Sequence, residues 1–181
     1  VSTYSEEMPF EKEITVKELA YAYPGSGAVL EKFNCRICKG EHVGFKGSSG
    51  VGKSTLFNLL AGLLEPNSGE IWIDGILLNG TTRSSWMKRL GYVPQEVFIF
   101  NGTLAENIAL GRKKIDYDRV KEILEQVSLS RWAEALPDGI HTLLGEAGGR
   151  LSGGQRQRIG IARALYKRVE VLLLDEATSA L

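Results

Sequence analysis

The sequence lacks the features of a membrane span and of a cysteine-based metal or redox site. No apolar run approaches the roughly 18–20 residues that a helix needs to cross a bilayer, and no signal peptide opens the chain. Cys35 and Cys38 form a lone C-x-x-C with no second ligand pair, on a predicted strand where residues three apart face opposite sides. We therefore interpret both cysteines as structural and the chain as cytosolic and reduced.

An excess of charge of either sign is also lacking. Lys and Arg together number 22, as do Asp and Glu, so there is no overall basic field to attract nucleic acid or anionic lipid. The 181 residues are 43% apolar and 24% charged, an ordinary composition for one domain with a sizeable core. The chain begins with valine rather than methionine, which suggests a segment of a longer polypeptide.

The first third of the chain has the pattern of short strands joined by turns. Residues typical of strands are punctuated there by Gly, Pro, Asn and Asp. A glycine-rich loop, residues 47–52, precedes a helix that is expected to run to about Leu60. The predicted strands are Ile14–Tyr23, Phe33–Cys38, His42–Phe45 and Glu70–Ile73, with the second and third paired as a hairpin.

Helices dominate from about Thr103 to Leu136. The predicted helices are Ser84–Arg89, Asp116–Val127, Ser130–Leu136 and Ser152–Lys167, with strands at Leu90–Val93 and Val169–Leu174. Val171–Leu174 has no alternation, as expected of a parallel strand buried on both faces. The predicted fold is α/β: a P-loop NTPase core with an N-terminal antiparallel β subdomain and an inserted helical subdomain.

The glycine-rich loop has the spacing of a phosphate-binding loop. Its residues fit G-x-x-x-x-G-K-[ST] at every fixed position, between an apolar segment and a predicted helix. They are Gly47, Ser48, Ser49, Gly50, Val51, Gly52, Lys53 and Ser54, and Thr55 follows as a further nucleotide-binding candidate. Glycines let backbone N–H groups converge on phosphates at a helix N-terminus. Lys53 is expected to reach the β- and γ-phosphates of ATP, and Ser54 to hold Mg²⁺.

Two carboxylates follow the predicted strand Val171–Leu174. At the carboxyl edge of a parallel sheet, Asp175 would complete the Mg²⁺ shell, and Glu176 would orient or deprotonate the attacking water. Alone, Asp-Glu after an apolar run is also an ordinary strand end with solvated acids. The pairing with the phosphate loop favours the catalytic interpretation.

The next motif is Leu151-Ser152-Gly153-Gly154-Gln155. Ser152 and Gln155 make a capping box for the helix that follows, which does not explain the two glycines between them. The motif is the ABC signature sequence, and the chain resembles the nucleotide-binding domain of an ABC transporter. In that family Ser152, Gly153, Gly154 and Gln155 would bind the γ-phosphate of an ATP held by a second subunit. The resemblance therefore implies the ABC ATPase fold and a head-to-tail dimer around two ATPs.

Two further residues take roles from this resemblance. Tyr23, in Tyr-Ala-Tyr-Pro, matches the aromatic residue that stacks on adenine, with Tyr21 as the competing candidate and a buried strand aromatic as the simpler interpretation. Gln95, in Tyr-Val-Pro-Gln, matches the Q-loop glutamine, which contacts Mg²⁺ and links ATP to the membrane domain. We count Gln95, Lys53 and Glu176 as the catalytic candidates.

Two stretches resemble ABC exporters in particular. Residues 97–108 resemble the exporter segment after the Q-loop, and residues 144–149, centred on Glu146, resemble the exporter loop that touches the coupling helices of the transmembrane domain. The implied location is the cytoplasmic face of the plasma (inner) membrane, as a peripheral domain of a transporter. The transported substrate is not encoded in these motifs.

The sequence departs from the family pattern near its C-terminus. Residues 177–181 begin the D-loop and stop before its aspartate, and neither His42 nor His141 has the context of the switch histidine. We therefore expect this 181-residue chain to bind ATP and to hydrolyse it barely or not at all.

The predicted division has a linker at 1–13, an ATPase core at about 14–95 and 156–181, and a helical and signature subdomain at about 96–155. The leading hypothesis is the ATP-hydrolysing motor of an exporter. A soluble ABC ATPase that acts on ribosomes or DNA, and a regulatory module that binds ATP without turnover, are the alternatives.

Overall fold

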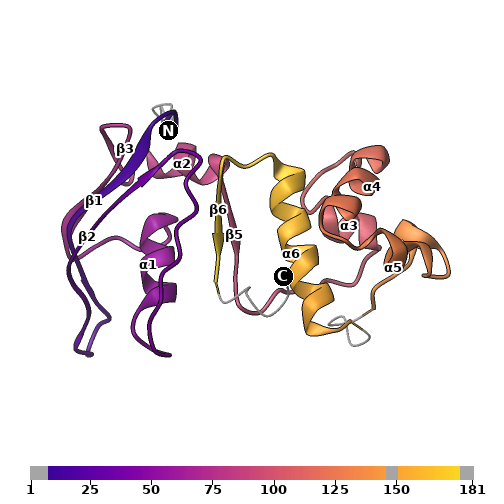
Figure 1. Cartoon of the computed structure of the whole chain (residues 1–181), viewed down its shortest axis with the longest axis horizontal. Coiled ribbons are helices and arrows are strands. Elements are labelled where there is room, and N and C mark those ends of the chain that lie inside the picture. Colours follow the sequence, from indigo (N-terminus) through magenta and orange to yellow (C-terminus); the bar gives the residue numbers. More distant parts are fainter. Residues whose placement is uncertain (1–7, 146–150, 176–181) are drawn as a thin grey trace. The chain divides into compact units, whose positions relative to one another are not determined.

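A computed structural model describes residues 8–145 and 151–175 (Figure 1). The chain divides into two units, Val1–Leu90 and Gly91–Leu181, which are described separately below. This geometric division leaves the functional division into core and helical subdomain as a prediction. Among the described residues, no helix combines the length and the apolar character of a membrane span.

The first unit contains an antiparallel sheet with the strand order β2-β1-β3-β4. The strands are β1 (Glu13–Ala22), β2 (Ala28–Cys38), β3 (Ser68–Ile73) and β4 (Ile76–Leu77). Val16 of β1 pairs with Cys35 on one side and with Ile71 on the other. Alternate residues Ile14, Val16, Ile71 and Ile73 are buried, as one apolar face requires. The predicted antiparallel β subdomain is confirmed.

A second cluster in this unit is built around Trp86. It lies in α2 (Arg83–Arg89), is fully buried, and donates its indole N–H to the carbonyl of Leu60, the last residue of α1 (Lys53–Leu60), at 2.7 Å. Phe10 packs edge-on against it with ring centroids 5.8 Å apart. Met8 is also buried. Residues 8–10, within the predicted linker, are therefore packed into the first unit.

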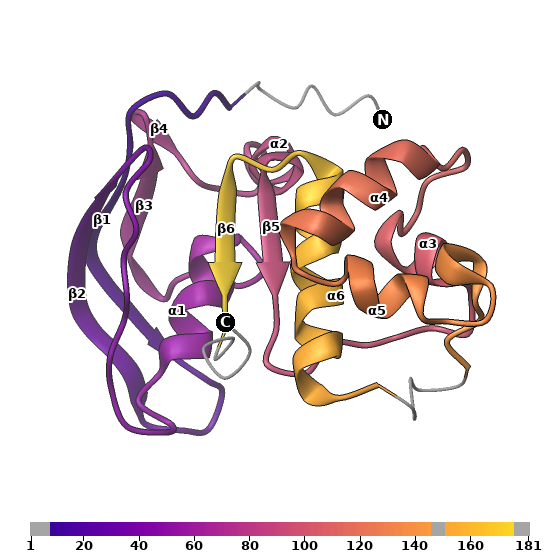
Figure 2. The same cartoon turned by 45° about the vertical axis from the view of Figure 1, so that its right-hand side comes forward.

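The second unit contains two strands and most of the helices. β5 (Leu90–Val93) and β6 (Val171–Leu174) form a two-stranded sheet and run in the same direction (Figure 2). The helices are α3 (Leu104–Ile108), α4 (Tyr117–Gln126), α5 (Ser130–Glu134), the 3₁₀ turn η1 (Gly139–His141) and α6 (Gly153–Lys167). The predicted face of the helix at 116–127 is buried, with Val120, Ile123, Leu124 and Val127 all inside the core of this unit.

One sequence prediction of a strand is wrong. Residues 42–45 are not a strand, and Val43 is 42% exposed, because an apolar segment becomes a strand only when a neighbour pairs with its backbone. Within the first unit, the described sheet gives this segment no partner. β6 is a strand, as predicted, and its residue Leu173 is buried. The expected burial of this strand on both faces stays a prediction.

Candidate functional site

The phosphate loop of the first unit depends on glycines with positive φ. Gly50 has φ 79° and Gly52, the N-cap of α1, has φ 99°. A Cβ on Gly52 would lie 2.8 Å from the Cγ1 and 3.1 Å from the carbonyl oxygen of Val29. A side chain is thus excluded at Gly52 by backbone conformation and by space. The sequence folds here into a tight turn that leads directly into α1.

Lys53 is the first residue of α1, and its side chain folds back over the loop. Its Nζ donates to the carbonyl oxygens of Gly47 and Ser48, both at 2.9 Å. The ammonium group and the N-terminus of α1 therefore place positive charge at the same loop. That combination suits the phosphates of a nucleotide.

The aromatic candidate Tyr23 lies next to the phosphate loop. Its hydroxyl is 3.2 Å from Oγ1 of Thr55, a buried residue in the first turn of α1. Tyr23 is 41% exposed, whereas Tyr21 is buried and packs edge-on against it with centroids 5.0 Å apart. Of the two competing tyrosines, Tyr23 is the one that can present a ring face to a base. Its stacking on adenine remains a prediction.

In the second unit, Asp175 lies at the carboxyl ends of both strands. Its N–H donates to the carbonyl of Val93 at 3.0 Å, and its carboxylate accepts the Tyr92 hydroxyl at 3.3 Å. Asp175 is 4% exposed. Gln95 follows two residues after Val93, on an exposed turn. The structure therefore places Asp175 beside the chain segment that carries Gln95.

The candidate Mg²⁺ ligands are the Ser54 hydroxyl, the Gln95 amide oxygen and the Asp175 carboxylate. All three are hard oxygen donors, the kind that Mg²⁺ takes alongside nucleotide phosphates and water. Ser54 belongs to the first unit and the other two to the second. Among the described residues, no three or more His, Cys, Asp or Glu side chains form a group that could hold a metal ion by themselves. The donor set therefore fits a metal held mainly by phosphates, as Mg²⁺ is in P-loop sites.

The signature sequence begins α6 with the predicted capping box. Ser152 Oγ accepts the N–H of Gln155 at 3.1 Å, and Gln155 Oε1 accepts the N–H of Ser152 at 2.8 Å. A Cβ added to Gly153 would meet no described atom within 4 Å. Packing within the described chain therefore does not require this glycine. The observation is consistent with a close approach by another molecule.

Some predicted positions lie outside the described residues. They are Glu176, the exporter-loop residue Glu146, and the D-loop segment 177–181. The catalytic role of Glu176 therefore rests on the sequence.

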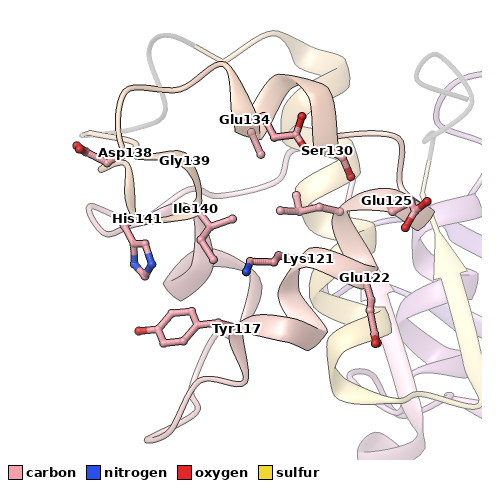
Figure 3. Close-up of a pocket in the computed structure, with 12 residues that line it drawn as sticks. Tyr117, Lys121, Glu122, Glu125, Ser130, Glu134, Asp138, Gly139, Ile140 and His141 are labelled. Atoms are coloured by element: carbon pink, nitrogen blue, oxygen red, sulfur yellow. The ribbon is translucent and has the colours of Figure 1, made fainter.

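The described residues of the second unit also form a hollow of about 850 Å³, to which α4, α5 and η1 contribute (Figure 3). The rings of Tyr117 and His141 lie on one side, with centroids 5.0 Å apart. None of the predicted nucleotide-binding residues lines it. This hollow is thus separate from the residues expected to do the chemistry.

Sequence reasoning missed the polar contacts that α6 makes with the segment after β5. Gln157 donates to the carbonyl of Gln95 at 2.6 Å, and Arg163 donates to the carbonyl of Phe98 at 2.6 Å. In the structure Gln157 is buried and Arg163 is half-buried, which the residue types alone do not reveal. Their partners are more than 60 residues away in sequence, so local patterns could not identify them.

Comparisons with known proteins agree with these motifs. The sequence model of the ABC transporter family matches residues 30–179. An uncharacterized ABC transporter ATP-binding protein, YwjA of Bacillus subtilis (strain 168), is 45% identical over 168 residues, which are 93% of this chain and 29% of that protein. An ATP-dependent lipid A-core flippase of Ralstonia nicotianae is 42% identical over 173 residues, with the same two coverages.

A solved structure of a bacterial Atm1-family ABC exporter with ATP bound is also similar. It superimposes with a TM-score of 0.91 and 35% sequence identity, over 98% of this chain and 31% of the exporter chain. The chain thus spans less than a third of the length of the relatives that it matches.

Proposed function

We propose, starting from the fact that this chain belongs to the ABC transporter family, that it is the ATP-hydrolysing motor domain of an exporter. It has the fold of the ABC ATPases, and ATPases of this family are coupled to transport. The observation that carries the proposal is the phosphate loop, where positive-φ glycines, Lys53 and the start of α1 converge. These features of the loop favour binding of a nucleotide, whether or not the chain resembles a known family.

In the proposed binding mode, each residue does one task for ATP. Lys53 exchanges its two carbonyl acceptors for phosphate oxygens, and Tyr23 offers its ring to adenine. Ser54, Gln95 and Asp175 would hold Mg²⁺, which when bound neutralises phosphate charge. Glu176 orients the attacking water and accepts its proton. Tyr92 and the Val93 carbonyl keep Asp175 at the strand ends, so that its carboxylate does not have to be positioned on binding.

The signature residues are proposed to serve a second ATP. The start of α6 is fixed by its own capping box, and Gly153 leaves its surroundings open. These features support the head-to-tail dimer, in which this helix end would approach the γ-phosphate held by the other subunit.

The proposed partners are a second nucleotide-binding domain and the coupling helices of a transmembrane domain. The names of the relatives, a lipid A-core flippase and an Atm1-family exporter, support an exporter at the cytoplasmic face of the membrane. They give no support to a soluble ATPase acting on ribosomes or DNA, or to a regulatory module.

The test is ATP turnover by the full-length protein that carries this domain. Glu176→Gln is expected to keep MgATP binding and to abolish steady-state phosphate release, and it should stabilise the ATP-bound dimer because the step that separates it is blocked. Glu122→Gln, an exposed acid on α4, is the matched control and should be unchanged. Turnover near wild type in Glu176→Gln would show that another group is the base.

A further inference from the structure

Three residues of α6, each three positions from the next, contact the segment that follows β5. The first is Gln157, whose amide Nε2 donates to the carbonyl of Gln95 at 2.6 Å, with the carbonyl of Pro94 at 3.5 Å. Gln157 is 8% exposed, while Gln95 lies on an exposed turn. A buried side chain of α6 thus holds the backbone of the Q-loop residue directly.

The second residue is Gly160, which lets the helix backbone approach the same segment. A Cβ at this position would lie 2.7 Å from Val97 Cγ2 and 2.9 Å from Val93 Cγ1. Glycine weakens the interior of a helix, so its presence here is explained by the close contact that it permits. The two valines on either side of Gln95 therefore pack tightly against α6.

The third residue is Arg163, which holds the end of the segment. Its guanidinium donates to the Phe98 carbonyl at 2.6 Å, the Asn107 carbonyl at 2.7 Å and the Asn107 amide oxygen at 2.9 Å. Asn107 is fully buried and also bonds the N–H and the carbonyl of Phe100. Burial lowers the pKa of Arg163, and each of these acceptors is neutral. The contacts fix residues 98–107 to α6.

Gln157, Gly160 and Arg163 form what we call the α6 seam. From Gln157 to Arg163 the helix rises by about 9 Å, and over this length the seam meets positions 95, 97 and 98 in the same order. Ser152, the N-cap of this helix, lies just over one turn before Gln157. The signature end of α6 and the loop that carries Gln95 are therefore parts of one connected body.

We propose that Gln157 is a positioning residue that couples the two ATP sites of the dimer. This rests on the proposed function, in which Gln95 acts on the ATP of its own subunit and Ser152–Gln155 act on the ATP of the other. Gln157 then lies between Gln95, which acts on one ATP, and the signature residues, which act on the other. When the second ATP binds at the capped start of α6, it restrains the position of this helix, and the hydrogen bond from Gln157 carries that restraint to Gln95.

The loss of this hydrogen bond should affect coupling more than stability. The Gln95 carbonyl lies on an exposed turn, so water can replace the amide of Gln157. The other end of that amide, Oε1, is buried and accepts no hydrogen bond from any described group. Leucine at this position therefore removes one bond and one unsatisfied acceptor together, and the fold should tolerate it.

The experiment measures the ATP dependence of phosphate release in the full-length protein. Wild type should have a Hill coefficient above 1, and Gln157→Leu should bring it close to 1. The net contribution of a single neutral hydrogen bond corresponds to about a two- to tenfold change in an equilibrium constant, and the coupling between sites should fall by that factor. Gln126→Leu makes the same chemical change on an exposed position of α4 and should leave the coefficient unchanged.

Two further measurements separate positioning from a structural role. MgATP affinity of the 181-residue chain and its melting temperature should be the same in wild type and Gln157→Leu. A second variant, Gly160→Ala, should also lower the Hill coefficient, because its methyl group would push Val97 away from the helix.

Several results would overturn the inference. One is a wild-type Hill coefficient of 1, and another is an unchanged coefficient in Gln157→Leu with turnover intact. A fall in nucleotide affinity and melting temperature together would show that Gln157 is structural. An inactive wild-type protein, or a chain that does not bind MgATP, would remove the proposed function itself, which is a different result from an active enzyme that ignores the substitution.

Discussion

The helices that begin at the phosphate loop and at the signature sequence start in different ways. α1 starts after Gly52, which has a left-handed backbone, and no described side chain caps it. α6 starts after Ser152, which has an extended backbone and a complete capping box. Both starts were predicted to face a phosphate. The structure shows that one is built from backbone conformation and the other from side-chain hydrogen bonds.

This difference indicates different roles for the starts of α1 and α6 in binding ATP. The first N–H groups of α1 have no side-chain acceptor among the described residues, so an anion can take that place. At α6, the Ser152 hydroxyl already accepts the N–H of Gln155. We therefore expect the phosphate loop to supply most of the affinity for ATP, and the signature to act once ATP is already bound.

The substitution with the largest expected effect is Gly154→Asp in the full-length protein. A carboxylate at the start of α6 would face the γ-phosphate of the other subunit's ATP and repel it. Loss of a positioned group at the transition state typically costs about 10²–10³ in rate, so turnover should fall at least that far. ATP binding to the 181-residue chain should stay within about twofold. Phosphate release measures the turnover, and calorimetry measures ATP binding. Loss of ATP binding by the isolated chain would contradict the head-to-tail dimer, in which Gly154 contacts only the ATP of the other subunit.

The next prediction is that Lys53→Ala lowers the affinity for MgATP. Charge-assisted hydrogen bonds contribute roughly 1.5–3 kcal/mol each, which is about 10- to 100-fold in affinity for MgATP. Titration calorimetry of the 181-residue chain measures it. Lys46→Ala removes an exposed lysine just before the same loop and is the control. If both variants bind ATP equally well, the phosphate loop is not the nucleotide site.

How well the sequence predicted these features depends on how far apart the interacting residues are along the chain. The capping box of α6 and the apolar face of α4 follow from positions three or four apart, and both are confirmed. Residues 42–45 failed because strand formation depends on a partner that local pattern does not specify. The bond from Gln157 to Gln95 joins residues 62 apart, so no local pattern contains it. The glycines at 153 and 160 look alike in sequence, yet Gly160 is closely packed and Gly153 is open.

A matched pair of glycine substitutions tests the comparison of the two helix starts directly. Gly52→Ala places a Cβ on a left-handed backbone, at a cost of about 1–2 kcal/mol, and against Val29, where overpacking costs about 1–3 kcal/mol more. Gly153→Ala meets open space and should stabilise α6 by up to about 1 kcal/mol. Urea unfolding of the 181-residue chain measures both. Equal effects of the two substitutions on unfolding would show that the two starts are not built differently.

The smallest expected effect concerns the turn between β3 and β4 in the first unit. Desolvation acts to raise the pKa of Asp74, but hydrogen bonds to its carboxylate from the N–H groups of Glu11, Glu13 and Lys12 outweigh it and hold the pKa below its ordinary value. A carboxyl with a lowered pKa stabilises the fold above its unfolded pKa of about 3.9, and this stabilisation is lost as the pH falls through the folded value.

The Asp74→Asn variant should therefore have a lower free energy of unfolding than wild type at pH 7. The difference should be at most about 1 kcal/mol, because the site is half-buried and screened by solvent. The difference should shrink towards zero as the pH falls below about 4, because the wild-type carboxyl then becomes neutral as well. Glu31→Gln, on an exposed position of β2, should show no such pH dependence. Both substitutions are made in a Trp132→Phe background, so that Trp72 and Trp86 report on the first unit alone. A difference between Asp74→Asn and its parent that stays constant from pH 7 to pH 3 would mean that the charge of Asp74 contributes nothing, and that the turn is held by conformation, as the phosphate loop is.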